Sequence, residues 1–137
     1  MKIDGQCYCG ALVFEAELDK SKIGICHCAD CQSLSASAFR TIAIVAGEKF
    51  KVIKGTPKKY VKVSESGNRR VQAFCGDCGS GLYACDDSDN PAVVNVRVGT
   101  VRQRAELAPV FECWKDSALS WLPELEGSRK HSRNPKF

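Results

Sequence analysis

Seven of the nine cysteines in this chain of 137 residues fall into three tight clusters. The clusters are a CxC, a CxCxxC and a CxxC, formed by Cys7 and Cys9, by Cys26, Cys28 and Cys31, and by Cys75 and Cys78. Thiolates packed this closely are soft metal ligands, and zinc is the usual metal for them. The sequence therefore predicts a metal-binding protein with zinc as its cofactor.

Seven ligands suggest two different sites. A closed structural zinc site takes four cysteines, and three protein ligands leave one coordination position open, as in catalytic zinc sites. The CxxC is a common zinc-binding spacing, and the glycines in FCGDCG permit the tight turn that it needs. The simplest closed site pairs the CxC with this CxxC. The CxCxxC then forms the second site, and we expect two zinc ions per chain.

One alternative remains open from spacing alone. Both sites could be structural, with His27, Cys85 or Cys113 as the fourth ligand of the second site. His27 stands between two ligand cysteines, so we expect its side chain to point away from the metal. Cys85 and Cys113 stand alone in the sequence and are expected to be small buried hydrophobic residues.

Disulfide bonds are disfavoured. The number of cysteines is odd, and the first residues, MKIDGQCYCG, lack the apolar core of a signal peptide. Neighbours in CxC and CxxC spacing also close only short loops, where cross-linking stabilises least. We therefore expect reduced thiols and a cytoplasmic location.

The elements that position these clusters are predicted to be mostly strands. Alternating or β-branched apolar patterns indicate strands at 11–18, 39–46, 49–55, 58–63, 69–74, 81–85 and 93–99, with a turn at 64–68. Helix is expected as a short segment at 31–38, whereas 100–108 could be another short helix or an irregular crossing segment. Pro123 breaks any helix over 114–125. Strands at such short intervals predict a mainly β fold, a sandwich or folded-over sheets, with little helix.

The length predicts one domain, which we place at 1–126, followed by a basic, flexible tail at 127–137. The formal net charge is +4. Two zinc ions would add four positive charges and seven thiolates would remove seven, which lowers the net charge to +1. Four basic residues of the tail, Arg129, Lys130, Arg133 and Lys136, equal the formal excess, so we expect a folded body that is near neutral or slightly acidic, which weakens a nucleic-acid interpretation. No apolar run approaches the roughly 20 residues that span a bilayer, so no membrane partner is expected.

The motifs CYCGAL, CHCADCQ, RRVQAFCGDCGSGL and VRVGTV occur in this order, before a C-terminal segment with Trp and Pro. This order resembles the glutathione-dependent formaldehyde-activating (GFA) family, which includes CENP-V-type proteins, over Gly5 to Leu125. The resemblance implies an Mss4-like fold of several short, coiled antiparallel sheets around zinc. It also implies a structural zinc at Cys7, Cys9, Cys75 and Cys78, and a catalytic zinc at Cys26, Cys28 and Cys31.

For function, the resemblance implies a carbon–sulfur lyase that acts on the glutathione adduct of formaldehyde. Glutathione is anionic, so cationic side chains should line its pocket, and Gln32 is a further candidate donor. The cationic candidates are Arg40, Arg69, Arg70 and Arg97. The segment PVFECW departs from the family pattern, because Glu112 and Cys113 stand near the place where family members often carry a His and an Ile before the aromatic residue. The alternative function is a noncatalytic zinc module that binds protein or nucleic acid. The sequence leaves the oligomeric state open.

Overall fold

The structure is a computed structural model that describes residues 1–64 and 66–137. Strands dominate it, and the α-helix is short. The helix α1 spans Ala29–Ser35, and the strands are β1 (Lys2–Gln6), β2 (Val13–Glu17), β3 (Ile23–Cys26), β4 (Arg40–Ala46), β5 (Phe50–Lys54), β6 (Lys58–Val63), β7 (Arg69–Phe74), β8 (Gly81–Asp86), β9 (Val93–Arg97), β10 (Phe111–Cys113) and β11 (Arg129–Lys130).

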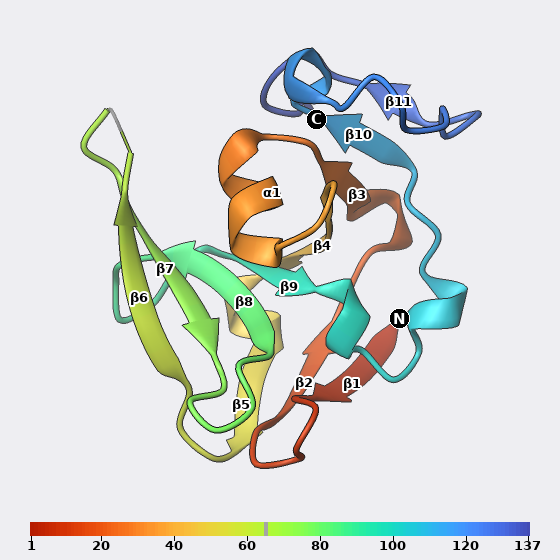
Figure 1. Cartoon of the computed structure of the whole chain (residues 1–137). Helices are drawn as coiled ribbons and strands as arrows, with labels where there is room; N and C mark the ends of the chain where they lie inside the picture. The colour runs from red at the N-terminus through yellow and green to blue at the C-terminus, as the bar shows by residue number, and fades with distance from the viewer. Residues whose placement is uncertain (65) are drawn as a thin grey trace.

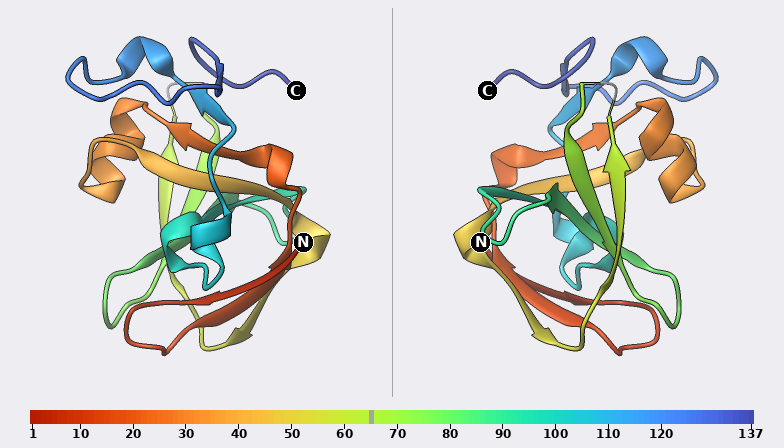
Figure 2. Two further views of the ribbon diagram at one scale, coloured as in Figure 1. Left: turned by 90° about the vertical axis from the view of Figure 1, so that its right-hand side faces the viewer. Right: turned by 90° about the vertical axis from the view of Figure 1, so that its left-hand side faces the viewer.

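The strands form two sheets. A three-stranded antiparallel sheet has the order β1-β2-β5, and an eight-stranded sheet has the order β11-β10-β3-β4-β9-β8-β7-β6. The larger sheet is mixed. β10 runs parallel to both β3 and β11, and the other strand pairs of this sheet are antiparallel. Figure 1 shows β1, β2 and β5 at the base of the molecule and α1 beside β3 and β4. The two side views place the C-terminal segment at the opposite end (Figure 2).

The main core lies between the two sheets. In β2 the inward residues Phe14 and Ala16 are buried while their neighbours are exposed or half-buried, which is the period-2 pattern of a strand with one covered face. Phe50 of β5 stacks between Phe14 and Tyr83, with ring centroids 5.6 Å and 4.7 Å away. Burial of each large apolar side chain contributes roughly 1.5–3 kcal/mol. These aromatic contacts hold the small sheet against β8 of the large one.

The predicted fold class, mainly β with little helix, is confirmed. All seven expected strands are present, with ends shifted by a few residues. The expected turn at 64–68 includes residue 65, which lies outside the described residues. In the described part of the chain, none of the helices is long and apolar enough to cross a bilayer.

Three elements near the cysteine clusters were not predicted: β1, β3 and β10. Within 100–108, expected to be a short helix or an irregular crossing segment, Arg104–Glu106 forms a 3-10 helix, and most of the other residues lie in turns or irregular backbone. The division into a domain at 1–126 and a flexible tail stays a prediction. Within that tail, Arg129–Lys130 forms β11 alongside β10.

Candidate metal centres

The first cluster joins two turns that are far apart in the sequence. Cys7 and Cys9 lie in the turn after β1, and Cys75 and Cys78 lie in the turn after β7. All four sulfurs lie within 4.8 Å of one another. The Sγ atoms of Cys7 and Cys9 are 3.6 Å apart, and those of Cys9 and Cys75 are 3.7 Å apart. Tetrahedral zinc with Zn–S bonds of about 2.3 Å requires sulfurs about 3.8 Å apart, so this cluster fits the ion.

Backbone geometry in both turns favours this arrangement. Gly79 has φ +79°, a left-handed conformation that glycine adopts without strain and that closes the CxxC turn. The N–H groups of Leu12 and Cys78 point at the sulfurs of Cys7 and Cys75, at 3.2 and 3.5 Å. Such N–H groups stabilise negative charge on sulfur. A metal here would connect the small sheet to the large one.

Ser80 strengthens the contact between the two turns. Its hydroxyl accepts a hydrogen bond from the backbone N–H of Tyr8 at 3.0 Å and lies 3.3 Å from the sulfur of Cys78. Hydrogen bonds from the side chain and backbone of Ser80 lower the pKa of the Cys78 thiol to about 5. Cys78 is therefore ready to serve as a thiolate ligand.

The second cluster comes from one short segment. Cys26 ends β3, Cys28 is the N-cap of α1, and Cys31 lies in the first turn of α1. The Cys28 sulfur accepts a hydrogen bond from the Cys31 N–H at 3.3 Å, as an N-cap side chain does. The three sulfurs lie within 4.8 Å of one another, and no further Cys, His, Asp or Glu in residues 1–64 and 66–137 joins the set. The structure thus brings together the predicted four and the predicted three.

Three thiolates this close cannot all carry charge without a cation. Hydrogen bonds from Cys26 and Cys31 lower the pKa of the Cys28 thiol, and the same coupling raises the pKa of Cys31. The pKa of Cys26 is also raised, with the neighbouring Cys113 as the largest cause and Cys28 next. A bound divalent cation would remove this conflict, because a coordinating thiol is deprotonated outright. The donor set therefore fits a soft metal.

A cavity of about 300 Å³ opens beside the second cluster. Cys26, Cys31 and Cys113 form part of its wall. Four cationic side chains also line it, namely Arg40, Lys62, Arg70 and Arg97. Cys113 is buried, as predicted, and packs against Cys26.

The four arginines suggested by the sequence have different surroundings. Arg69 is exposed and pairs with Asp87 at 2.9 Å, outside the residues that line the cavity. Arg70 pairs with Asp86 at 2.8 Å. Arg40 and Arg97 instead donate to one shared acceptor, as described below.

Arg40 is buried, and Arg97 is half-buried at the end of β9. Both guanidinium groups donate to the side-chain oxygen of Gln72, at 3.2 and 2.9 Å. Burial is the largest cause that lowers the pKa of Arg97, and repulsion from Arg40 is the next. Together with smaller effects they bring this pKa to about 9. Arg97 therefore remains charged at neutral pH.

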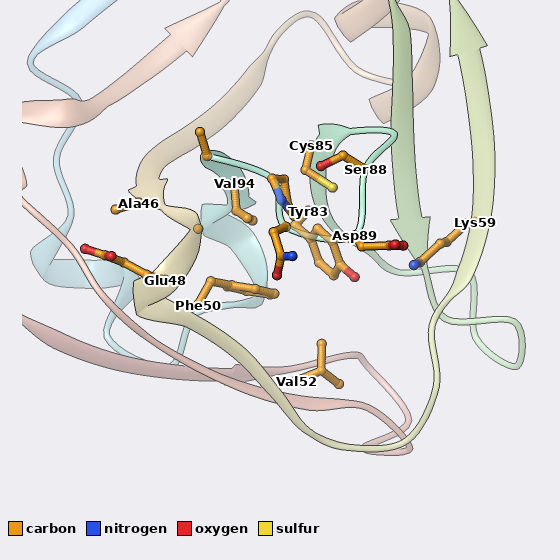
Figure 3. Close-up of a pocket in the computed structure, with 14 residues that line it drawn as sticks. Ala46, Glu48, Phe50, Val52, Lys59, Tyr83, Cys85, Ser88, Asp89 and Val94 are labelled. Carbon is orange, nitrogen blue, oxygen red and sulfur yellow. The ribbon is translucent and has the colours of Figure 1, made fainter.

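A separate cavity of about 700 Å³ lies between β5, β8 and the loop before β9 (Figure 3). Phe50 and Tyr83 point into it, and Lys59 and Asp89 stand at its side (Figure 3). Cys85 lines its wall and is buried, which agrees with the prediction of a small hydrophobic residue. None of the seven clustered cysteines contributes to this cavity.

Comparison with known proteins agrees with the cysteine pattern. The model of the glutathione-dependent formaldehyde-activating enzyme family matches residues 2–117. This chain belongs to the GFA family. All seven clustered cysteines lie inside the matched range.

One curated relative and one solved structure resemble this GFA chain. It is 29% identical over 93 residues to an uncharacterized lyase of Schizosaccharomyces pombe, which covers 67% of this chain and 64% of the yeast protein. The chain therefore spans less than two thirds of that relative. A crystal structure of a Rhodobacter sphaeroides protein superposes with a TM-score of 0.59 at 22% identity, over 72% of this chain and 87% of that one. The second likeness shows a shared fold.

Glu112 of β10 has a structural role. Glu112 and His27 are both buried, and their side chains meet at 2.9 Å. His27 thus points away from the metal cluster, as predicted. Its backbone oxygen accepts a hydrogen bond from the side chain of Gln32 at 2.8 Å, and Gln32 also donates to Ser117 at 3.1 Å. Gln32 therefore connects α1 to the C-terminal segment through hydrogen bonds, and it is not among the residues that line the cavity beside the second cluster.

Glu112 is the buried centre of a charged cluster that the sequence did not indicate. Burial alone would raise its pKa, but hydrogen bonds from Ser128, His27 and Lys130 outweigh that effect and lower it to about 2. The Ser128 hydroxyl donates at 2.7 Å, and Lys130 lies 3.3 Å away. Glu112 thus ties β10 to residues 128–130.

We expect Glu112→Gln to destabilise the GFA chain by about 3 kcal/mol at pH 7, because it leaves buried partners of a charged group unmatched. The folded pKa is lower than the ordinary value of 4.5, so this contribution is complete above pH 4.5 and is lost as pH falls toward about 2. Urea unfolding of the wild type and the variant at several pH values measures it. The exposed Glu124→Gln is the control. A difference that stays constant below pH 4.5 would contradict this assignment.

Proposed function

We propose that this chain is a zinc enzyme that forms and breaks the carbon–sulfur bond between a glutathione-type thiol and a small aldehyde such as formaldehyde. Membership of the GFA family and the lyase named among its relatives support a lyase at the family level. The substrate pair is the family's own, carried to this chain through the cysteine motifs. We place the enzyme in the cytoplasm, with a domain at 1–126 and a basic tail at 127–137.

The two clusters receive different roles in this proposal. Cys7, Cys9, Cys75 and Cys78 would hold a structural zinc, because four sulfurs complete its coordination. Cys26, Cys28 and Cys31 would hold a catalytic zinc with one position free. When bound, zinc at the second cluster supplies a Lewis-acid position at which an added thiol loses its proton near neutral pH.

The observation that carries the proposal is the cavity beside the second cluster. Two of the three cysteines of the second cluster, Cys26 and Cys31, form part of the wall of this cavity of about 300 Å³, so a small thiol can approach them. Cationic side chains on the same wall would attract an anionic thiol and hold it near the metal position. The chain's own contribution is therefore to bind and orient the two reactants.

The reaction balances without any oxidant or further reactant. The thiol sulfur attacks the aldehyde carbon, a sulfur–carbon bond forms, and the C=O double bond becomes a C–O single bond. The proton released from the thiol ends on the new hydroxyl group. The reverse reaction returns that proton and breaks the sulfur–carbon bond, which is the lyase direction.

Exchange spectroscopy by NMR tests this function. We expect the zinc-loaded protein to speed the exchange between free formaldehyde and S-hydroxymethylglutathione in proportion to protein concentration, because it holds both reactants together. The uncatalysed reaction is measured in the same buffer without protein. If exchange rates with and without the protein agree, this chain is not an enzyme for this pair, and a zinc module that binds another molecule becomes the better account.

A further inference from the structure

Arg40 and Arg97 form an unusual pair in the wall beside the second cluster. Their guanidinium groups point at one neutral acceptor, the side-chain oxygen of Gln72. Among the described residues, each makes this one side-chain hydrogen bond, although a guanidinium offers five N–H donors. In residues 1–64 and 66–137, no carboxylate lies within 4.0 Å of either group.

Two like charges held together at low exposure are costly unless an anion joins them. The other two cationic side chains of the cavity already have carboxylate partners, since Lys62 pairs with Asp30 at 2.9 Å and Arg70 pairs with Asp86 at 2.8 Å. A zinc with three thiolates would carry one net negative charge, whereas Arg40 and Arg97 carry two positive ones. The cavity therefore keeps a surplus of positive charge even when the metal is bound.

The pair also links two adjoining hollows of the surface. Arg40, Gln72 and Arg97 line the cavity beside the second cluster and a second cavity of about 440 Å³. The second cavity has aromatic walls, formed by Phe39, Tyr60, Phe74 and Tyr83. A ligand whose sulfur sits at the metal would thus pass the two arginines before its remaining part reaches the aromatic walls.

From this geometry we propose that Arg40 and Arg97, held side by side by Gln72, bind a carboxylate of the thiol substrate. Two guanidinium groups match the planar pair of oxygens of a carboxylate. The substrate class is therefore a thiol that bears a carboxylate within reach of its sulfur, and glutathione is one member. This inference rests on the proposed function for the position of the sulfur. The arginine pair itself depends only on the structure.

Calorimetric titration of the zinc-loaded protein with S-methylglutathione tests the pair, because the methylated sulfur cannot supply a thiolate to the metal. We expect the free acid to bind at least about tenfold more tightly than its diethyl ester. Arg97→Gln and Arg40→Gln should each remove about that factor for the acid and leave the ester unchanged. Arg69→Gln is the control, since Arg69 is exposed and pairs with Asp87.

Zinc content and thermal midpoint show whether each variant remains folded. If one of the two arginine variants does not fold, the other still tests the site. Equal affinity for acid and ester, no binding of the acid, or an equal loss in Arg69→Gln would each overturn the carboxylate site. Arginine-dependent binding of the acid, together with no thiol exchange at the metal, would uphold the site and reject the proposed function alone.

Discussion

Cys78→Ser is expected to yield unfolded or insoluble protein. The four-cysteine cluster connects the turn after β1 with the turn after β7, and therefore joins the small sheet to the large one. Structural zinc in small domains contributes about 10–16 kcal/mol of binding free energy, which equals or exceeds the total stability of a typical domain, about 5–15 kcal/mol. Serine is a far weaker zinc ligand than a thiolate, so most of this contribution would be lost.

Far-ultraviolet circular dichroism and thermal melts of purified or refolded protein measure this effect. Cys7→Ser should behave alike, because it removes a sulfur from the same cluster. Cys85→Ser is the matched control, since it makes the same exchange at a buried cysteine outside both clusters. A Cys78→Ser protein with an unchanged thermal midpoint would show that the first cluster is not a structural metal site.

Cys28→Ser is expected to keep the fold and lose the metal and the activity of the second cluster. The three cysteines come from residues 26–31 alone, so the metal there joins no distant parts of the chain. Serine is also a preferred N-cap residue, so it should preserve the start of α1 that Cys28 caps in the wild type. Metal analysis should give one zinc per chain in place of two, and formaldehyde exchange should fall to the rate without protein.

The combination of results separates the two roles. Equal loss of fold in Cys28→Ser and Cys78→Ser would show that both clusters are structural. Two zinc ions in Cys28→Ser would mean that another residue, with Cys113 the nearest candidate beside Cys26, completes the second site.

The sequence predicted the cysteine clusters well because metal ligation imposes strict local spacing. The short spacing identified the cysteines of each motif, whereas spacing alone left the division into four and three open, and the structure shows which distant motifs meet. The strands at 58–63 and 69–74 were predictable for a similar reason, since alternation and turn residues are local signals. β3 and β10 escaped prediction because they are short and buried on both faces, so they lack alternation.

The residues that give the cavity its charge could not be predicted in the same way. Arg40, Gln72 and Arg97 come from β4, β7 and β9, and only the order of strands in the large sheet brings them together. The four arginines were equivalent candidates in the sequence. In the structure Arg69 and Arg70 pair with carboxylates, whereas the other two donate to Gln72. The pairing of Glu112 with His27 likewise depends on the parallel contact of β10 with β3, to which no local pattern points.

The central claim is that the second cluster holds a metal with a position open to thiols, whereas the first is closed. Cobalt-substituted protein tests this most directly, because sulfur-to-cobalt absorption responds to each added thiolate ligand. Addition of glutathione should increase this absorption in the wild type by the contribution of one thiolate per chain, and Cys28→Ser should show no change. An unchanged spectrum in the wild type at saturating glutathione would contradict the account, since it would show that the second site is closed.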